Sequence, residues 1–187
     1  MISYISVAST STEKDVLVRI AKAWSALNRL RVIWKSALPD KIKINFFRAV
    51  VETVLLYGSP AWTLTKKLEK KLDGTYTRML RAVLNVHWKT HPSNKCLYGN
   101  LSKISLVIKD RRMRFAGHCY RSKEEVISEL MLWKPTHGTV KPGRPFKTYT
   151  KQLTEDCEYH FEDLHNAMSD REVWRSRVNM VRETNPI

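Results

Sequence analysis

Apolar residues recur every three or four positions along much of the chain, which is the spacing of one face of an α-helix. The first such segment predicts a helix that begins at Thr10, because Thr10 and Glu13 have the spacing of a capping box. Its apolar face consists of Val16, Ile20, Ala23, Leu27, Leu30 and Trp34, and its opposite face carries Lys22 and Arg29. Before this helix, residues 3–7 read Ser-Tyr-Ile-Ser-Val and predict a short strand.

A second helix is predicted from Pro39, a residue favoured in a first helical turn, to Tyr57, where Gly58 and Pro60 follow. Its polar residues form only a narrow stripe, namely Lys41, Asn45, Arg48 and Glu52. Since most other positions are apolar, we expect this helix to be buried on most sides.

The third helix, predicted over residues 65–86, has two contrasting faces. Its apolar face consists of Leu68, Leu72, Tyr76, Met79, Val83 and Val86. Its basic face consists of Lys67, Lys70, Lys71, Arg78 and Arg81, a span of about 21 Å at 1.5 Å per residue. Such a span can follow several phosphates of a duplex, or it can be a solvated surface. Gly74 lies on the same face and is either simply tolerated there or lets a phosphate backbone come close.

The turn His91-Pro92-Ser93-Asn94 is the best candidate for a domain boundary, dividing residues 1–92 from residues 93–187. Beyond it, helices are predicted at 124–132 and 148–158, with a basic loop rich in proline and glycine at 134–147. A last helix is expected to be capped by Ser169 with Glu172 and to pack Val173, Trp174, Val178 and Val181. Because strand patterns are almost absent, the fold class is mainly α.

The charge of the chain indicates a polyanionic partner. Lys and Arg number 33 against 18 acidic residues, a net charge of +15. Residues 1–150 carry 28 basic and 10 acidic side chains, whereas residues 151–187 carry 5 and 8. A basic body of this kind is typical of nucleic-acid binding, although a basic protein without a specific partner remains an alternative.

The composition also bears on location. The three cysteines are widely spaced, which favours reduced thiols in the nucleus or the cytoplasm over a disulfide framework. No apolar run approaches the roughly 18 residues of a membrane span, so we expect an intracellular protein without a membrane partner.

Two catalytic or metal-binding hypotheses have weak support. His87, His91 and Cys96 have finger-like spacing, but no Cys-x2-Cys pair accompanies them, so no metal is expected. A metal-dependent nuclease would need clustered carboxylates, whereas Asp40 and Glu69 lie on two predicted helices. We therefore expect no catalytic residues and no cofactor.

Six segments, in order across nearly the whole chain, resemble the region downstream of the palm in non-LTR retrotransposon reverse transcriptases. Ser6 replaces a glycine of that pattern, Pro60 replaces a glutamate, and Tyr149 stands where tryptophan is common. The segments are Tyr4-Ile5-Ser6, Leu55-Leu56-Tyr57-Gly58-Ser59-Pro60-Ala61-Trp62, Arg78 to Trp88, Arg111 to His118 with Arg121, Gly143-Arg144-Pro145, and Asp170-Arg171 with Trp174-Arg175.

The resemblance implies a helical thumb that holds a template–primer duplex, with residues 1–8 as a remnant of the strand that ends the palm. It further implies a C-terminal helical region that helps bind template RNA or target DNA. The family's palm requires magnesium and contains a Tyr-x-Asp-Asp motif. This motif is absent from these residues, so polymerase activity is not carried over. The palm and fingers become expected partners.

We therefore predict a nucleic-acid-binding part of an RNA-directed DNA polymerase, or alternatively a stand-alone basic binding module or an element fragment without function. Trp62, Trp88 and Trp174 are expected to pack in the interior, and His118 to lock a Gly-His turn through hydrogen bonds. The residues expected to contact nucleic acid are Lys67, Lys70, Lys71, Arg78, Arg81, Arg111, Arg112, Arg114, Arg121, Arg144 and Lys147.

Overall fold

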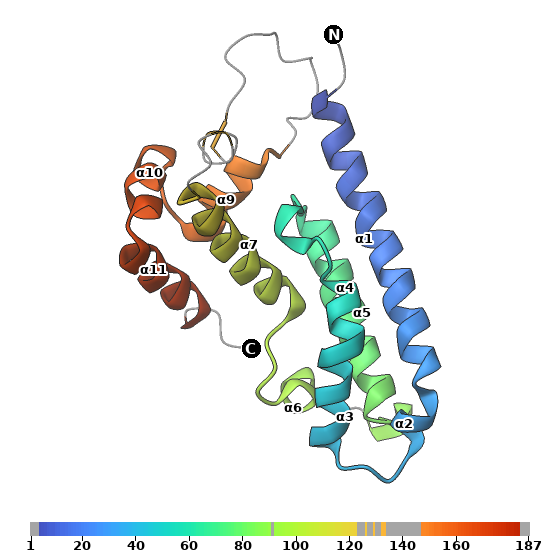
Figure 1. The fold of residues 1–187 in the computed structure, drawn as a ribbon. Helices are drawn as coiled ribbons and strands as arrows, with labels where there is room; N and C mark the ends of the chain where they lie inside the picture. The colour runs from blue at the N-terminus through green and yellow to red at the C-terminus, as the bar shows by residue number, and fades with distance from the viewer. Residues whose placement is uncertain are drawn as a thin grey trace. The chain divides into compact units, whose positions relative to one another are not determined.

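A computed structural model describes residues 4–90, 92–122, 126, 129, 132–133 and 147–183. Throughout these residues the fold is helical, with no strand, which confirms the mainly α class (Figure 1). Most of the helix predicted at 124–132, and all of the loop predicted at 134–147 except its last residue, lie outside the described residues.

The contacts divide the chain into two compact units. The N-terminal unit comprises Thr10–Gly58 and Thr65–Val107, and the C-terminal unit comprises Met1–Ser9, Ser59–Leu64 and Ile108–Pro186. These units are defined by contacts between residues and do not test a division of function. The functional division predicted after residue 92 therefore stays a prediction.

The long helix α1 spans Tyr4–Arg29, so the strand predicted at residues 3–7 and the helix start predicted at Thr10 are wrong. No glycine or proline interrupts residues 4–13, and the β-branched residues there disfavour a helix only weakly. The predicted apolar face is confirmed in part: Val16, Ala23 and Leu27 are buried, whereas Ile20 and Leu30 are half-buried and the helix ends at Arg29. After α1 the chain forms the short helix α2, Arg31–Lys35, whose buried Trp34 donates from Nε1 to the Leu27 carbonyl at 2.8 Å.

A continuous helical run follows Pro39, made of α3 (Asp40–Phe46), a π-helix η1 (Phe47–Glu52) and α4 (Thr53–Leu55). The prediction that this helix is buried on most sides is wrong, because Ile42, Phe46 and Val50 are 40%, 43% and 39% exposed. Glu52, predicted on the polar stripe, is instead buried. The wider π turn rotates each residue by less than an α turn does, and this brings Glu52 round to the buried side.

Helix α5, Lys66–Val83, follows the 3-10 turn η2 (Ser59–Ala61) and forms as predicted up to its last turn. Thr65 is the N-cap, and its hydroxyl accepts from the Leu68 amide at 3.3 Å. The helix ends before Asn85, which has a φ of 50°. The 3-10 turn η3 (Trp88–Thr90), the short helix α6 (Asn94–Tyr98) and the start of α7 (Ile104–Tyr120) complete this unit.

The C-terminal unit is built from the rest of α7 with α9 (Tyr149–Cys157), α10 (Phe161–Ser169) and α11 (Arg171–Glu183). Helix α9 agrees with the prediction, whereas α10 was not predicted. The core of this unit includes Met113, Ala116, Leu132, Leu153, Cys157, Leu164, Ala167, Met168, Trp174, Val178 and Val181.

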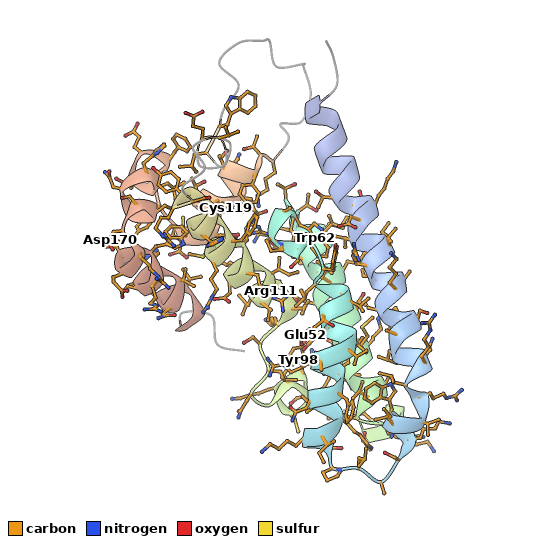
Figure 2. The ribbon with its side chains drawn as sticks, viewed as in Figure 1. Glu52, Trp62, Tyr98, Arg111, Cys119 and Asp170 are labelled. Carbon is orange, nitrogen blue, oxygen red and sulfur yellow. The ribbon has the colours of Figure 1, made fainter. Side chains whose placement is uncertain are left out.

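Helix α11 is capped differently from the prediction. Ser169 is the last residue of α10, and the cap of α11 is Asp170, which Figure 2 labels. Its Oδ1 accepts from the amides of Glu172 at 2.8 Å and Val173 at 3.2 Å. Val173 is 46% exposed and does not join the predicted core, because Trp174, Val178 and Val181 already complete a stripe at helical spacing.

The cap of α11 can be tested by substitution. Asp170→Ala removes the acceptor for two amides, and we expect the free energy of unfolding to fall by about 1 kcal/mol. Ser169→Ala is the matched control, because its hydroxyl only donates to the Asn166 carbonyl. Equal losses in urea denaturation would contradict the assignment of Asp170 as the cap.

Candidate nucleic-acid interface

Helix α5 separates its cations from its apolar residues. Lys67, Lys70, Lys71 and Arg78 are exposed. The opposite side is buried and consists of Leu68, Leu72, Thr75, Tyr76, Met79, Leu80 and Val83. Because that side is held in the interior, the four exposed cations, which we call the α5 stripe, face solvent.

The fifth predicted cation of α5 has a structural contact. Arg81 is half-buried, and its Nη2 donates to the Pro92 carbonyl at 3.1 Å and to Asn94 Oδ1 at 3.2 Å. Its guanidinium therefore holds the turn that leads into α6. We place Arg81 beside the α5 stripe rather than within it.

The carboxylates of α5 are engaged away from the stripe. Glu69 pairs with Lys66 at 3.1 Å, and Asp73 accepts from the amide and the hydroxyl of Ser105 at 3.0 and 2.9 Å. Glu69 is therefore balanced by Lys66, which is outside the stripe, and of these two acids only Asp73 opposes the four cations of the stripe.

Tyr76 fixes α5 within the N-terminal unit, a contact that sequence reasoning missed. Its hydroxyl donates to Glu52 Oε2 at 2.8 Å, and burial beside this carboxylate raises the pKa of Tyr76. Its ring lies 5.4 Å from that of Phe47 and 6.0 Å from that of Tyr98, centroid to centroid. Arg48 also lies 3.9 Å from the Glu52 carboxylate, and the sequence pattern places Arg48 and Glu52 only in a narrow polar stripe.

Arg112, predicted to contact nucleic acid, is instead 1% exposed in the C-terminal unit. Its Nη1 pairs with Asp156, whose Oδ1 accepts from Gln152 Nε2 at 3.0 Å. Gln152 in turn accepts from the Leu64 amide at 3.0 Å. This buried chain of contacts joins α7, α9 and the segment 59–64, and it leaves Arg112 no surface at which to meet a phosphate.

Other cations predicted in this unit also have internal partners. Lys147 Nζ lies 2.6 Å from Glu155 Oε2 and donates to the Leu64 carbonyl at 3.3 Å. Arg121 Nη1 donates to the Met168 carbonyl at 2.7 Å. Arg144 lies outside the described residues.

Two of the predicted contact residues on α7 remain accessible. Arg114 is exposed and pairs with Asp110 at 3.1 Å, one helical turn before it, and Arg111 is half-exposed. Figure 2 labels Arg111 on α7. The second predicted contact surface is thus reduced to these two arginines among the residues that the structure describes.

The contact between Gly117 and Trp174 joins two of the segments that resemble the retrotransposon family, residues 111–118 and residues 170–175. A Cβ at Gly117 would lie 2.3 Å from Trp174 Nε1, so only glycine fits against the indole. The same Nε1 donates to the Met113 carbonyl at 2.9 Å. The Gly-His turn predicted to be locked by His118 is wrong, because both residues lie inside α7 and His118 is exposed.

The predicted tryptophan positions are confirmed where the structure describes them. Trp62 and Trp174 are buried at 3% and 2% exposed. The side chain of Trp88 lies outside the described part.

The two residues weighed for nuclease chemistry lie on different helices, and His91, weighed for metal binding, lies outside the described residues. Asp40 opens α3, whereas Glu69 lies on α5 and pairs with Lys66. Over the residues with a described placement, no group of three or more His, Cys, Asp and Glu side chains could hold a metal ion. In the same part of the chain, no helix is both long and apolar enough to cross a membrane.

The chain is similar to a transposon-derived protein of Caenorhabditis elegans, with 27% identity over 141 residues. The match covers 72% of this chain and 50% of the relative, so the chain spans about half the length of that protein. No family model and no solved structure matches the chain. The similarity supports a transposon origin.

The opposite environments of Arg112 and Arg114 predict opposite effects on stability. Arg112→Ala leaves Asp156 buried without its cation, so we expect the free energy of unfolding to fall by about 3–5 kcal/mol. Arg114→Ala breaks only an exposed pair on one helix, which costs less than about 1 kcal/mol. Urea denaturation of both variants checks this, and a similar loss for the two would refute the buried pair.

The three thiols should react at different rates. Cys96 is exposed, whereas Cys119 and Cys157 are buried. Burial raises the pKa of Cys119 and raises the pKa of Cys157 to about 11, so little reactive thiolate forms at pH 8. We expect a maleimide to modify Cys96 first, and mass spectrometry of the labelled protein checks the order of modification. All three should react together in denaturant, and fast labelling of Cys157 in the folded protein would contradict its burial.

Proposed function

We propose that this chain is a nucleic-acid-binding part of a transposon-derived protein, and that the α5 stripe grips the phosphate backbone of a duplex. The single observation that carries this proposal is the exposure of Lys67, Lys70, Lys71 and Arg78 on a helix whose other side is anchored by buried residues. Cations presented from a rigid element can meet phosphates with little loss of conformational freedom on binding.

The finer assignment rests on the resemblance to the region downstream of the palm in non-LTR retrotransposon reverse transcriptases. Under that assignment the N-terminal unit acts as a helical thumb on a template–primer duplex. The similarity to a transposon-derived protein is consistent with this assignment. Polymerase chemistry is not proposed for these residues, because the family's Tyr-x-Asp-Asp motif is not among them.

We propose a second nucleic-acid contact surface with fewer residues than the sequence predicted. Arg111 and Arg114 of α7 are accessible and can contact template RNA or target DNA. Arg112 is buried in the C-terminal unit, and the half-buried Arg121 and Lys147 each have a partner within it. Contacts made by these residues stabilise the unit that presents the two accessible arginines.

The first experiment measures binding of the purified chain to a labelled RNA–DNA hybrid by fluorescence anisotropy across a salt series. Each phosphate contact adds roughly 0.9 to the slope of log affinity against log salt. Reversal of three stripe cations, Lys70→Glu, Lys71→Glu and Arg78→Glu, should weaken binding and lower that slope by roughly 3, with helicity kept in circular dichroism.

A matched control separates the stripe from net charge. Lys14, Lys22 and Arg29 are exposed on α1 in the same unit, and reversing them changes the net charge by the same amount. We expect this control to bind far better than the stripe variant. Equal weakening of both variants, or unchanged binding by the stripe variant, would refute the assignment of the stripe.

A further inference from the structure

The described glycines differ in what requires them. Gly58 and Gly99 have φ values of 74° and 52°, a conformation that side chains rarely adopt. Gly117 is required by the indole of Trp174, as described above. Gly74 has neither requirement, because it lies within α5 and a Cβ there would meet no atom within 4 Å.

Gly74 is therefore an exposed residue in the middle of a helix with no explanation inside the described chain. Glycine disfavours a helix more than any residue except proline, and alanine would fit here without a clash. A contact with something outside the chain would account for it.

The position of Gly74 in the α5 stripe indicates the nature of that contact. At about 100° per residue, Lys67 lies two turns before Gly74 and within about 20° of its direction. Lys70 precedes it and Arg78 follows it by one turn, each within about 40° on opposite sides. Arg78 also reaches back over this turn, because its Nε donates to the Gly74 carbonyl at 3.4 Å. Gly74 is thus the centre of the stripe.

We propose that Gly74 is the point where the sugar–phosphate backbone of a bound duplex touches the main chain of α5. This inference rests on the function proposed for the stripe. Without a Cβ, a phosphate can lie against the helix within reach of Lys70, Lys71 and Arg78 together. A side chain there would hold the phosphate away from all three cations, and the attraction of each falls with distance.

Two substitutions test the contact, with binding to a labelled RNA–DNA hybrid as the measurement. Gly74→Ala should weaken binding roughly threefold and Gly74→Gln roughly tenfold or more, since a longer side chain displaces the phosphate further. Both leave the net charge unchanged. Gly74→Ala should at the same time raise the melting temperature, because alanine favours the helix. A gain in stability with a loss of binding is the expected signature.

The matched control is Ala21→Gln, which adds the same side chain at an exposed position of α1 in the same unit. It should bind as the unmodified chain does. Equal weakening by Ala21→Gln would overturn the inference, because added bulk would then matter anywhere on the unit.

The outcomes separate this inference from the function on which it rests. If the Gly74 variants bind normally while the reversal of Lys70, Lys71 and Arg78 abolishes binding, the close contact is wrong and the stripe stands. If that charge reversal also binds normally, the proposed function fails and the contact at Gly74 fails with it.

Discussion

The hydrogen bond from Tyr76 to Glu52 is the contact on which the orientation of α5 depends. It lies in the interior of the N-terminal unit, where a buried carboxylate without a partner would be costly. The Tyr76 ring also contacts Phe47 and Tyr98, so one side chain joins α5 to the π-helix η1 and to α6. Figure 2 labels Glu52 and Tyr98 within this unit. With that side of α5 held inside, its lysines can only face outward.

The C-terminal unit uses the same residue type for two purposes. Arg112 and Arg114 are two positions apart on α7, which places them on different sides of the helix. Arg112 reaches Asp156 in the core, whereas Arg114 stays at the surface. The contact between Gly117 and Trp174 likewise joins α7 to α11. Segments that resemble a nucleic-acid-binding family thus owe much of their residue pattern to packing.

Separating the residues that pack from those that are free to bind reduces the set of residues in the proposed interface. Of the predicted contact residues that the structure describes, those free of tertiary partners gather on α5 and on the exposed side of α7. Their affinity for nucleic acid should come from phosphate contacts, which carry no sequence information directly. The thumb role proposed above requires binding of this kind, since a thumb that follows a duplex must accept any sequence.

The sequence by itself determined the mainly α class, the amphipathic character of α5 and the cations on its outer face. These follow from local spacing, because 3.6 residues per turn sets the direction of each side chain around its helix axis. Only the tertiary structure decided that Glu52 and Arg112 are buried and that Ile42 and Phe46 are exposed. Spacing gives a direction but not what packs there, and a π turn or a distant carboxylate such as Asp156 changes the outcome.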